Sequence, residues 1–142
     1  MKIVLGCDDK VAAWASERLG IAPMVGPLTA FGVIDSEGVI HGAIVFTNYN
    51  TSNIDATVVG PRCFTRNIIR AAADYCFNQL KCNRVTFRTK RKNKLACRIL
   101  AKHIGPNGFE GVAKSYYGRE KKDDAIIYRL DRNGAVKWCG VF

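Results

Sequence analysis

The 142-residue chain has few acidic side chains, only two histidines and no long apolar run. It carries 12 Asp and Glu against 22 Lys and Arg, which gives a formal net charge of +10. No apolar run is long enough to cross a bilayer, and the first residues lack the apolar segment and cleavage site of a signal peptide. We therefore expect a cytoplasmic protein that has no membrane partner.

The two histidines and six cysteines are too scattered to predict a metal centre. The cysteines, at positions 7, 63, 76, 82, 97 and 139, include no C-x-x-C pair and no regular framework. We expect reduced thiols, several of them in the core, and no bound metal. A serine or cysteine hydrolase is excluded because the sequence contains neither a nucleophile elbow nor a suitable histidine partner.

The positive charge is concentrated in the middle of the chain. Between Arg62 and Lys102 there are twelve Lys or Arg (62, 66, 70, 81, 84, 88, 90, 91, 92, 94, 98 and 102), and Asp74 is the one acid. Such asymmetry indicates an anionic partner, which a nucleotide phosphate, a nucleic acid backbone or an acidic protein would satisfy. With 48% hydrophobic residues, the chain has enough apolar material for one globular domain, which we place over residues 1–142.

Hydrophobic periodicity and turn signals predict an α/β fold. Strands are predicted at residues 2–5, 29–34, 39–47, 54–59, 84–90, 109–117 and 125–130, and helices at 8–19, 65–80 and 92–104. Three antiparallel strands followed by a strand–helix–strand crossover predict a mixed central sheet flanked by helices. Asn133-Gly134 is a hairpin signal, so residues 135–142 are predicted to add an edge strand, through which a homodimer could pair.

The stretch from Gly60 to Phe77 is the strongest candidate for a binding site. An apolar strand leads into Gly-Pro, a short basic turn, and a helix that Thr65 caps and whose apolar side includes Ile69. A helix N-terminus presents unpaired backbone N–H groups and the positive end of the helix dipole. Arg62 and Arg66 add full charges. The turn is therefore predicted to bind a pyrophosphate.

Asn93-Lys94-Leu95-Ala96, then Ile99-Leu100 and Gly108-Phe109-Glu110-Gly111, continue the predicted helix and strand. With this element order, the chain resembles the GCN5-related N-acetyltransferase (GNAT) superfamily from about residue 31 to 131. The Glu-Gly pair is more typical of the branch that acetylates protein N-termini and polyamines. Two features depart from the family pattern. Residues 62–67 contain no glycine where the family's phosphate loop usually has one, and Leu100 stands where many relatives have a tyrosine.

The resemblance implies a single-domain GNAT-like fold that binds acetyl-CoA as cosubstrate. It implies transfer of the acetyl group to a primary amine, on a protein N-terminus, a polyamine or another small amine, by direct attack in a ternary complex. The residues that it places at the cofactor are Val58, Val59, Arg62, Phe64, Thr65, Arg66, Asn67 and Asn93. Val58 or Val59 would donate a backbone N–H to the thioester carbonyl. Asn93 is equally explained as a helix N-cap.

Four residues are candidates for proton transfer. Asp55, near the start of the strand before the basic turn, is the candidate base, although a surface or turn acid explains it equally well. Cys97, Tyr116 and Tyr117 are candidates for protonating the leaving thiolate. The two tyrosines alternate on a predicted strand, so at most one faces inward.

Two other functions use the same residues. A GNAT-like protein that has lost catalysis would explain the glycine-free loop and the missing tyrosine. A nucleic-acid-binding protein would explain the basic block, but that block lacks interleaved stacking aromatics, since Phe87 lies on the apolar side of its strand. We therefore expect nucleic acid to be an unlikely partner.

Overall fold

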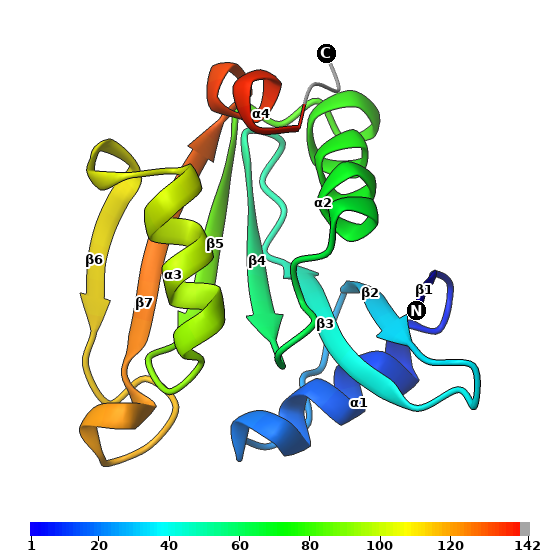
Figure 1. Cartoon of the computed structure of the whole chain (residues 1–142). Helices are drawn as coiled ribbons and strands as arrows, with labels where there is room; N and C mark the ends of the chain where they lie inside the picture. The colour runs from blue at the N-terminus through cyan, green and yellow to red at the C-terminus, as the bar shows by residue number, and fades with distance from the viewer. Residues whose placement is uncertain (140–142) are drawn as a thin grey trace.

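The computed structural model describes the backbone of residues 1–139 and the side chains of residues 1–136. Within this range, seven strands form one mixed sheet in the order β1-β2-β3-β4-β5-β7-β6 (Figure 1). The strands are β1 (Lys2–Val4), β2 (Thr29–Ile34), β3 (Ile40–Thr47), β4 (Asn53–Val59), β5 (Arg84–Lys90), β6 (Phe109–Ala113) and β7 (Ala125–Asp131). The helices are α1 (Asp8–Leu19), α2 (Arg66–Ala73), α3 (Lys94–His103) and α4 (Arg132–Cys139), with shorter turns η1 (Asp74–Gln79), η2 (Pro106–Gly108) and η3 (Lys121–Asp123).

The predicted α/β fold, a mixed sheet flanked by helices, is confirmed. Strands β1 to β4 form an antiparallel meander, and β4 pairs with β5 in parallel across the α2 crossover. Strand β7 then pairs antiparallel with both β5 and β6. None of the helices within the described range has the length and apolar character that crossing a membrane requires.

Two apolar clusters lie on opposite faces of the sheet. On one face, Val11 of α1 packs with Val45 of β3, and on the other, Ile68 of α2 and Leu100 of α3 pack with Phe46. Val45 and Phe46 are successive residues of one strand, so their side chains point to opposite faces. Helices α2 and α3 therefore stand on the same face, each beginning beyond the C-terminal end of the strand that precedes it (Figure 1).

The helix predicted over residues 65–80 begins as expected but changes its winding. Thr65 caps α2, its hydroxyl oxygen accepting a hydrogen bond from the Ile68 N–H at 3.4 Å. From Asp74 onward the helix is a π-helix, and the Asp74 carboxylate accepts from the side chains of Asn78 and Gln79 at 3.0 and 2.8 Å. The apolar face also differs, because Ile68 is fully buried whereas the predicted core residue Ile69 is half-buried.

The prediction of a C-terminal hairpin is wrong for the residues that the structure describes. Asn133-Gly134 lies in the first turn of α4, where the Gly134 N–H donates to the Asp131 carboxylate at 2.7 Å. This bond satisfies an N–H at the start of the helix, and buried Ala135 docks α4 into the core. The predicted edge strand is thus replaced by a helix over residues 135–139, and its part at 140–142 lies outside the described residues. The structure therefore does not support the predicted homodimer that would pair through this strand.

The end of β6 also differs from the prediction. Strand β6 ends at Ala113, so Tyr116 and Tyr117 lie in the loop before η3 rather than on a strand. The Tyr117 N–H donates to the Asp123 carbonyl at 3.0 Å, which closes this loop on itself. Helix α1 has the predicted bounds, but its N-cap position is Cys7, which makes no side-chain cap, and the Asp8 carboxylate accepts from the Ala30 N–H of β2 at 2.9 Å.

Replacing Ile68 by alanine should lower the free energy of unfolding by about 2–5 kcal/mol, because a fully buried side chain leaves a cavity. The matched control is Ile69→Ala, which removes the same atoms from a half-buried position and should cost clearly less. Urea unfolding followed by circular dichroism measures both. Equal losses for the two variants would contradict the observed orientation of α2.

Candidate functional site

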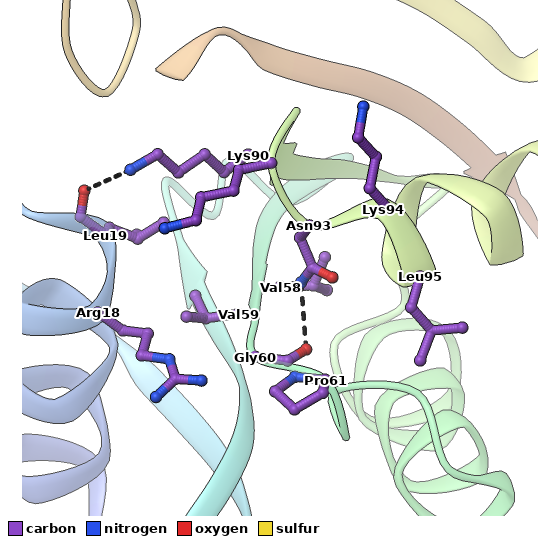
Figure 2. Close-up of a pocket in the computed structure, with 11 residues that line it drawn as sticks. Arg18, Leu19, Val58, Val59, Gly60, Pro61, Lys90, Asn93, Lys94 and Leu95 are labelled. Carbon is purple, nitrogen blue, oxygen red and sulfur yellow. Dashed lines mark hydrogen bonds between the residues drawn. The ribbon is translucent and has the colours of Figure 1, made fainter. Parts of the chain in front are cut away.

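A cavity of about 500 Å³ lies where β4 and β5 separate. The two strands pair in parallel as far as Val58 and Thr89, where the buried Thr89 hydroxyl donates to the Val58 carbonyl at 3.3 Å. Beyond this pair the chain turns at Gly60 on one side and enters α3 on the other. The cavity is lined by Arg18, Leu19, Val58, Val59, Gly60, Pro61, Lys90, Lys92, Asn93, Lys94 and Leu95 (Figure 2).

Asn93 connects the two sides of this cavity. Its side-chain N–H donates to the Gly60 carbonyl at 3.1 Å, and its side-chain oxygen accepts from the Ala96 N–H at 3.2 Å (Figure 2 draws the first bond). The second bond is the N-cap of α3 that the sequence allows. Asn93 therefore caps α3 and holds that helix to the end of β4. Its predicted contact with a cofactor stays a prediction, and its place in the lining is compatible with one.

The turn after β4 lies directly against β3. Gly60 has φ 87°, which favours glycine, and the Arg62 N–H donates to the His41 carbonyl at 3.3 Å. Gly42 of β3 faces this turn, and a Cβ added there would lie 2.5 Å from backbone atoms of both Arg62 and Cys63. Position 42 must therefore be glycine for the turn to lie this close to β3. The Cys63 side chain is buried here, and burial raises its thiol pKa to about 12.

The charges on the cavity lining are all positive. Arg18, Lys90, Lys92 and Lys94 contribute side chains, and the lining includes no Asp or Glu. The Lys90 ammonium is already engaged, since it donates to the Leu19 carbonyl at 3.2 Å and forms an ion pair with Asp123 at 3.1 Å. Lys92 and Lys94 are exposed. Sequence reasoning counted these lysines in the basic block but assigned none of them to the site, although Lys90 ends a predicted strand and Lys92 and Lys94 come directly after it.

The predicted cofactor residues divide into two groups. Val58, Val59 and Asn93 line the cavity. The others, Arg62, Phe64, Thr65, Arg66 and Asn67, follow the lining residue Pro61 in the turn and in the first residues of α2. Arg62, Arg66 and Asn67 are exposed, whereas the Phe64 ring packs edge-on against Phe87 with centroids 5.8 Å apart, and the Thr65 hydroxyl is used as a cap.

The structure does not bring Asp55 to the cavity. Its carboxylate accepts from Arg88 at 3.2 Å and from the side chains of Asn48 and Asn53 at 3.0 and 3.1 Å. Asp55 precedes Val59 by four residues on the same face of β4, which corresponds to about 13 Å along a strand. Any role as a base would need intervening water.

The two candidate tyrosines lie beside Arg88 in different environments. The Tyr116 ring is exposed and stacks on the Arg88 guanidinium, whose carbon is 4.9 Å from the ring centroid. Tyr117 is 7% exposed, and its hydroxyl is buried beside Thr57 and Arg88 without a hydrogen bond to the described residues. Burial raises the pKa of this hydroxyl, and Arg88 partly opposes the rise. The expectation that at most one tyrosine faces inward is met, although both lie in a loop.

Cys97 is turned toward the backbone between β5 and α3. Its half-buried thiol donates weakly to the carbonyls of Lys90 and Arg91 at 3.8 and 3.9 Å, and burial raises its pKa. Cys7, Cys63, Cys76 and Cys82 are also free thiols. No group of three or more His, Cys, Asp or Glu within the described residues could hold a metal ion.

No protein-family model and no curated protein matches this sequence. Solved structures of similar fold include a chimera of the spermidine N-acetyltransferase SpeG from Vibrio cholerae and hSSAT. It matches at 16% identity with a TM-score of 0.62, over 96% of this chain and 99% of that one. Mutant forms of the spermidine/spermine N-acetyltransferase SpeG from Vibrio cholerae match at 18% identity and a TM-score of 0.55, over 79% and 71% of the two chains. At these identities the comparison shows a GNAT-like fold.

Asn93→Ala should lower the free energy of unfolding more than Asn93→Ser. Both changes remove the bond to the Gly60 carbonyl, but serine keeps a hydroxyl that can cap α3. The difference should be about 1 kcal/mol, the usual worth of an N-cap. Equal stabilities in urea unfolding would show that the bond to Gly60, rather than the cap, is the contribution of Asn93.

Proposed function

We propose that this chain is an acetyl-CoA-dependent N-acetyltransferase that acts on a primary amine by direct attack in a ternary complex. The observation that carries the proposal is the cavity at the separated ends of β4 and β5, which has a cationic lining and lies beside the N-termini of α2 and α3. The GNAT-like fold supports it, since the structural relatives are N-acetyltransferases.

The residues around the cavity fit the parts of acetyl-CoA. Lys92 and Lys94, with Arg62 and Arg66 in the adjoining turn, supply the cations that a pyrophosphate needs. Apolar lining residues, among them Leu95, suit the less polar pantetheine arm. The turn contains no glycine, and the exposed side chains of Arg62 and Arg66 are the groups that we propose to meet the phosphates there.

Acetyl-CoA supplies an activated acyl group, and the chain supplies positioning and polarisation. Backbone N–H groups at the end of β4, from Val58 or Val59, are the candidates for polarising the thioester carbonyl. Holding the amine beside that carbonyl provides most of the acceleration. The amine proton leaves to water, with Asp55 reached through intervening molecules.

Among the candidates for protonating the leaving thiolate, we favour Tyr117. Its buried hydroxyl has no hydrogen bond to the described residues, whereas Cys97 is turned toward two backbone carbonyls and Tyr116 is exposed. Leu100, at the position where many relatives have a tyrosine, is fully buried in the core and cannot contribute.

A second function is a GNAT-like binding protein without catalysis. The observation that favours it is the side chain of Thr65, which replaces a loop glycine and is committed to capping α2. Such a protein would bind an acyl-CoA or another anion and release no free thiol in the presence of amines.

Acetyl-CoA should stabilise the protein against heat, and a short DNA duplex should not. At about 100 times its Kd, a ligand adds about 2.7 kcal/mol of apparent stability, which a thermal-shift titration detects. Arg62→Ala and Arg66→Ala should each weaken acetyl-CoA binding while the unliganded melting temperature stays nearly constant, because both side chains are exposed. Unchanged affinity in both variants would remove the turn from the cofactor site.

Tyr117→Phe should lower kcat by about 10²-fold, which is the lower end of the rate loss expected when a general acid is removed. The affinity for acetyl-CoA should stay unchanged. Stability should not fall, because the deleted hydroxyl has no hydrogen bond to the described residues. Tyr116→Phe is the matched control and should retain activity. Full activity in Tyr117→Phe would exclude the proposed acid.

A further inference from the structure

We propose that the amine acceptor carries an anionic group, either a carboxylate or a phosphate, and that Arg18 binds it. The inference rests on the proposed N-acetyltransferase function and names the acceptor class for the same cavity. It departs from the acceptor named for the structural relatives, spermidine, which is a polycation.

The cavity has two sides, and cations lie on both. Figure 2 shows Lys94 and Leu95 on α3, with Arg18 and Leu19 approaching from α1 on the other side of Val59 and Gly60. The α2 and α3 side holds the residues that we propose for the cofactor phosphates. Arg18 lies across the end of β4 from that side, so it is available to a second ligand.

Carboxylates near this part of the sheet are already neutralised by partners. Asp123 forms an ion pair with the lining residue Lys90 at 3.1 Å, and Asp124 forms one with Arg91 at 3.6 Å. Glu17, which precedes Arg18, is absent from the lining. A polycationic acceptor would thus meet positive charge in the cavity and no carboxylate on its lining.

Arg18 is suited to binding an anion. It forms no ion pair with the described residues, and its guanidinium lies 5.5 Å from the centroid of the Trp14 ring, which restricts its orientation. A guanidinium so placed can donate two parallel hydrogen bonds to a carboxylate or a phosphate. Arg18 is therefore proposed as a residue that determines specificity.

Four small amines separate the alternatives. β-Alanine carries a carboxylate, O-phosphoethanolamine a phosphate, ethanolamine neither, and spermidine only further positive charges. With saturating acetyl-CoA and thiol release as the readout, kcat/KM should be at least about tenfold higher for one of the two anionic amines than for ethanolamine or spermidine. The better of the two identifies the anion. Equal or higher values for spermidine, or no turnover of either anionic amine, would overturn the inference.

Arg18→Gln should raise KM for the anionic amine about tenfold, with kcat and the Kd for acetyl-CoA unchanged. Lys10→Gln, an exposed cation removed from the same helix eight residues earlier, is the matched control and should change neither. A loss of acetyl-CoA affinity in Arg18→Gln would assign Arg18 to the cofactor and overturn the inference while leaving the proposed function intact. Failure of the wild-type chain to bind acetyl-CoA would overturn both.

Discussion

The candidate site depends on the separation of two parallel strands and on the side chain of Asn93, which spans the gap between them. Strands β4 and β5 pair through Val58 and Thr89, after which each chain turns toward its own helix. The Asn93 side chain bonds to the end of β4 and to the start of α3, so the gap keeps its width without closing. The proposed binding of the cofactor and the proposed choice of acceptor both require that this gap stays open.

The positive charge of the lining favours anionic ligands in the gap between the strands. The lining combines four basic side chains with no acid, while Asp123 and Asp124, in the segment before β7, are held in ion pairs with Lys90 and Arg91. Ion pairs at partly exposed positions contribute little to stability. Their larger effect here is to remove free carboxylates from the vicinity of the cavity, which leaves its potential positive and favours anions.

Local patterns predicted most of the fold, because apolar runs and the turn residues between them mark most of the elements. The bounds of β5 agree with the sequence prediction, since Val85, Phe87 and Thr89 alternate with polar residues on a strand with one buried face. The C-terminal hairpin failed for the opposite reason. Asn133-Gly134 is a turn signal only when nothing competes, and the Asp131 carboxylate together with the docking of Ala135 makes it the first turn of a helix.

The site was only partly predictable, because its lining comes from three separate parts of the chain. Val58, Val59 and Asn93 were found through a family resemblance, but Arg18 lies on a helix distant in sequence and no local pattern marks it. Likewise, the distance of Asp55 from the cavity and the hydroxyl of Tyr117 beside Arg88 are consequences of strand register and loop path. Such features exist only in the assembled tertiary structure.

The contact between Gly42 and the turn at Arg62 and Cys63 links two segments that lie twenty residues apart in the sequence. Because the atoms that a Cβ at position 42 would meet belong to the backbone of the turn, no choice of side chain at position 62 or 63 relieves the clash. Glycine at position 42 is therefore required by the path of the turn and not by the residue types in the turn. The glycine that lets the turn lie against the sheet thus belongs to strand β3 and not to the turn itself.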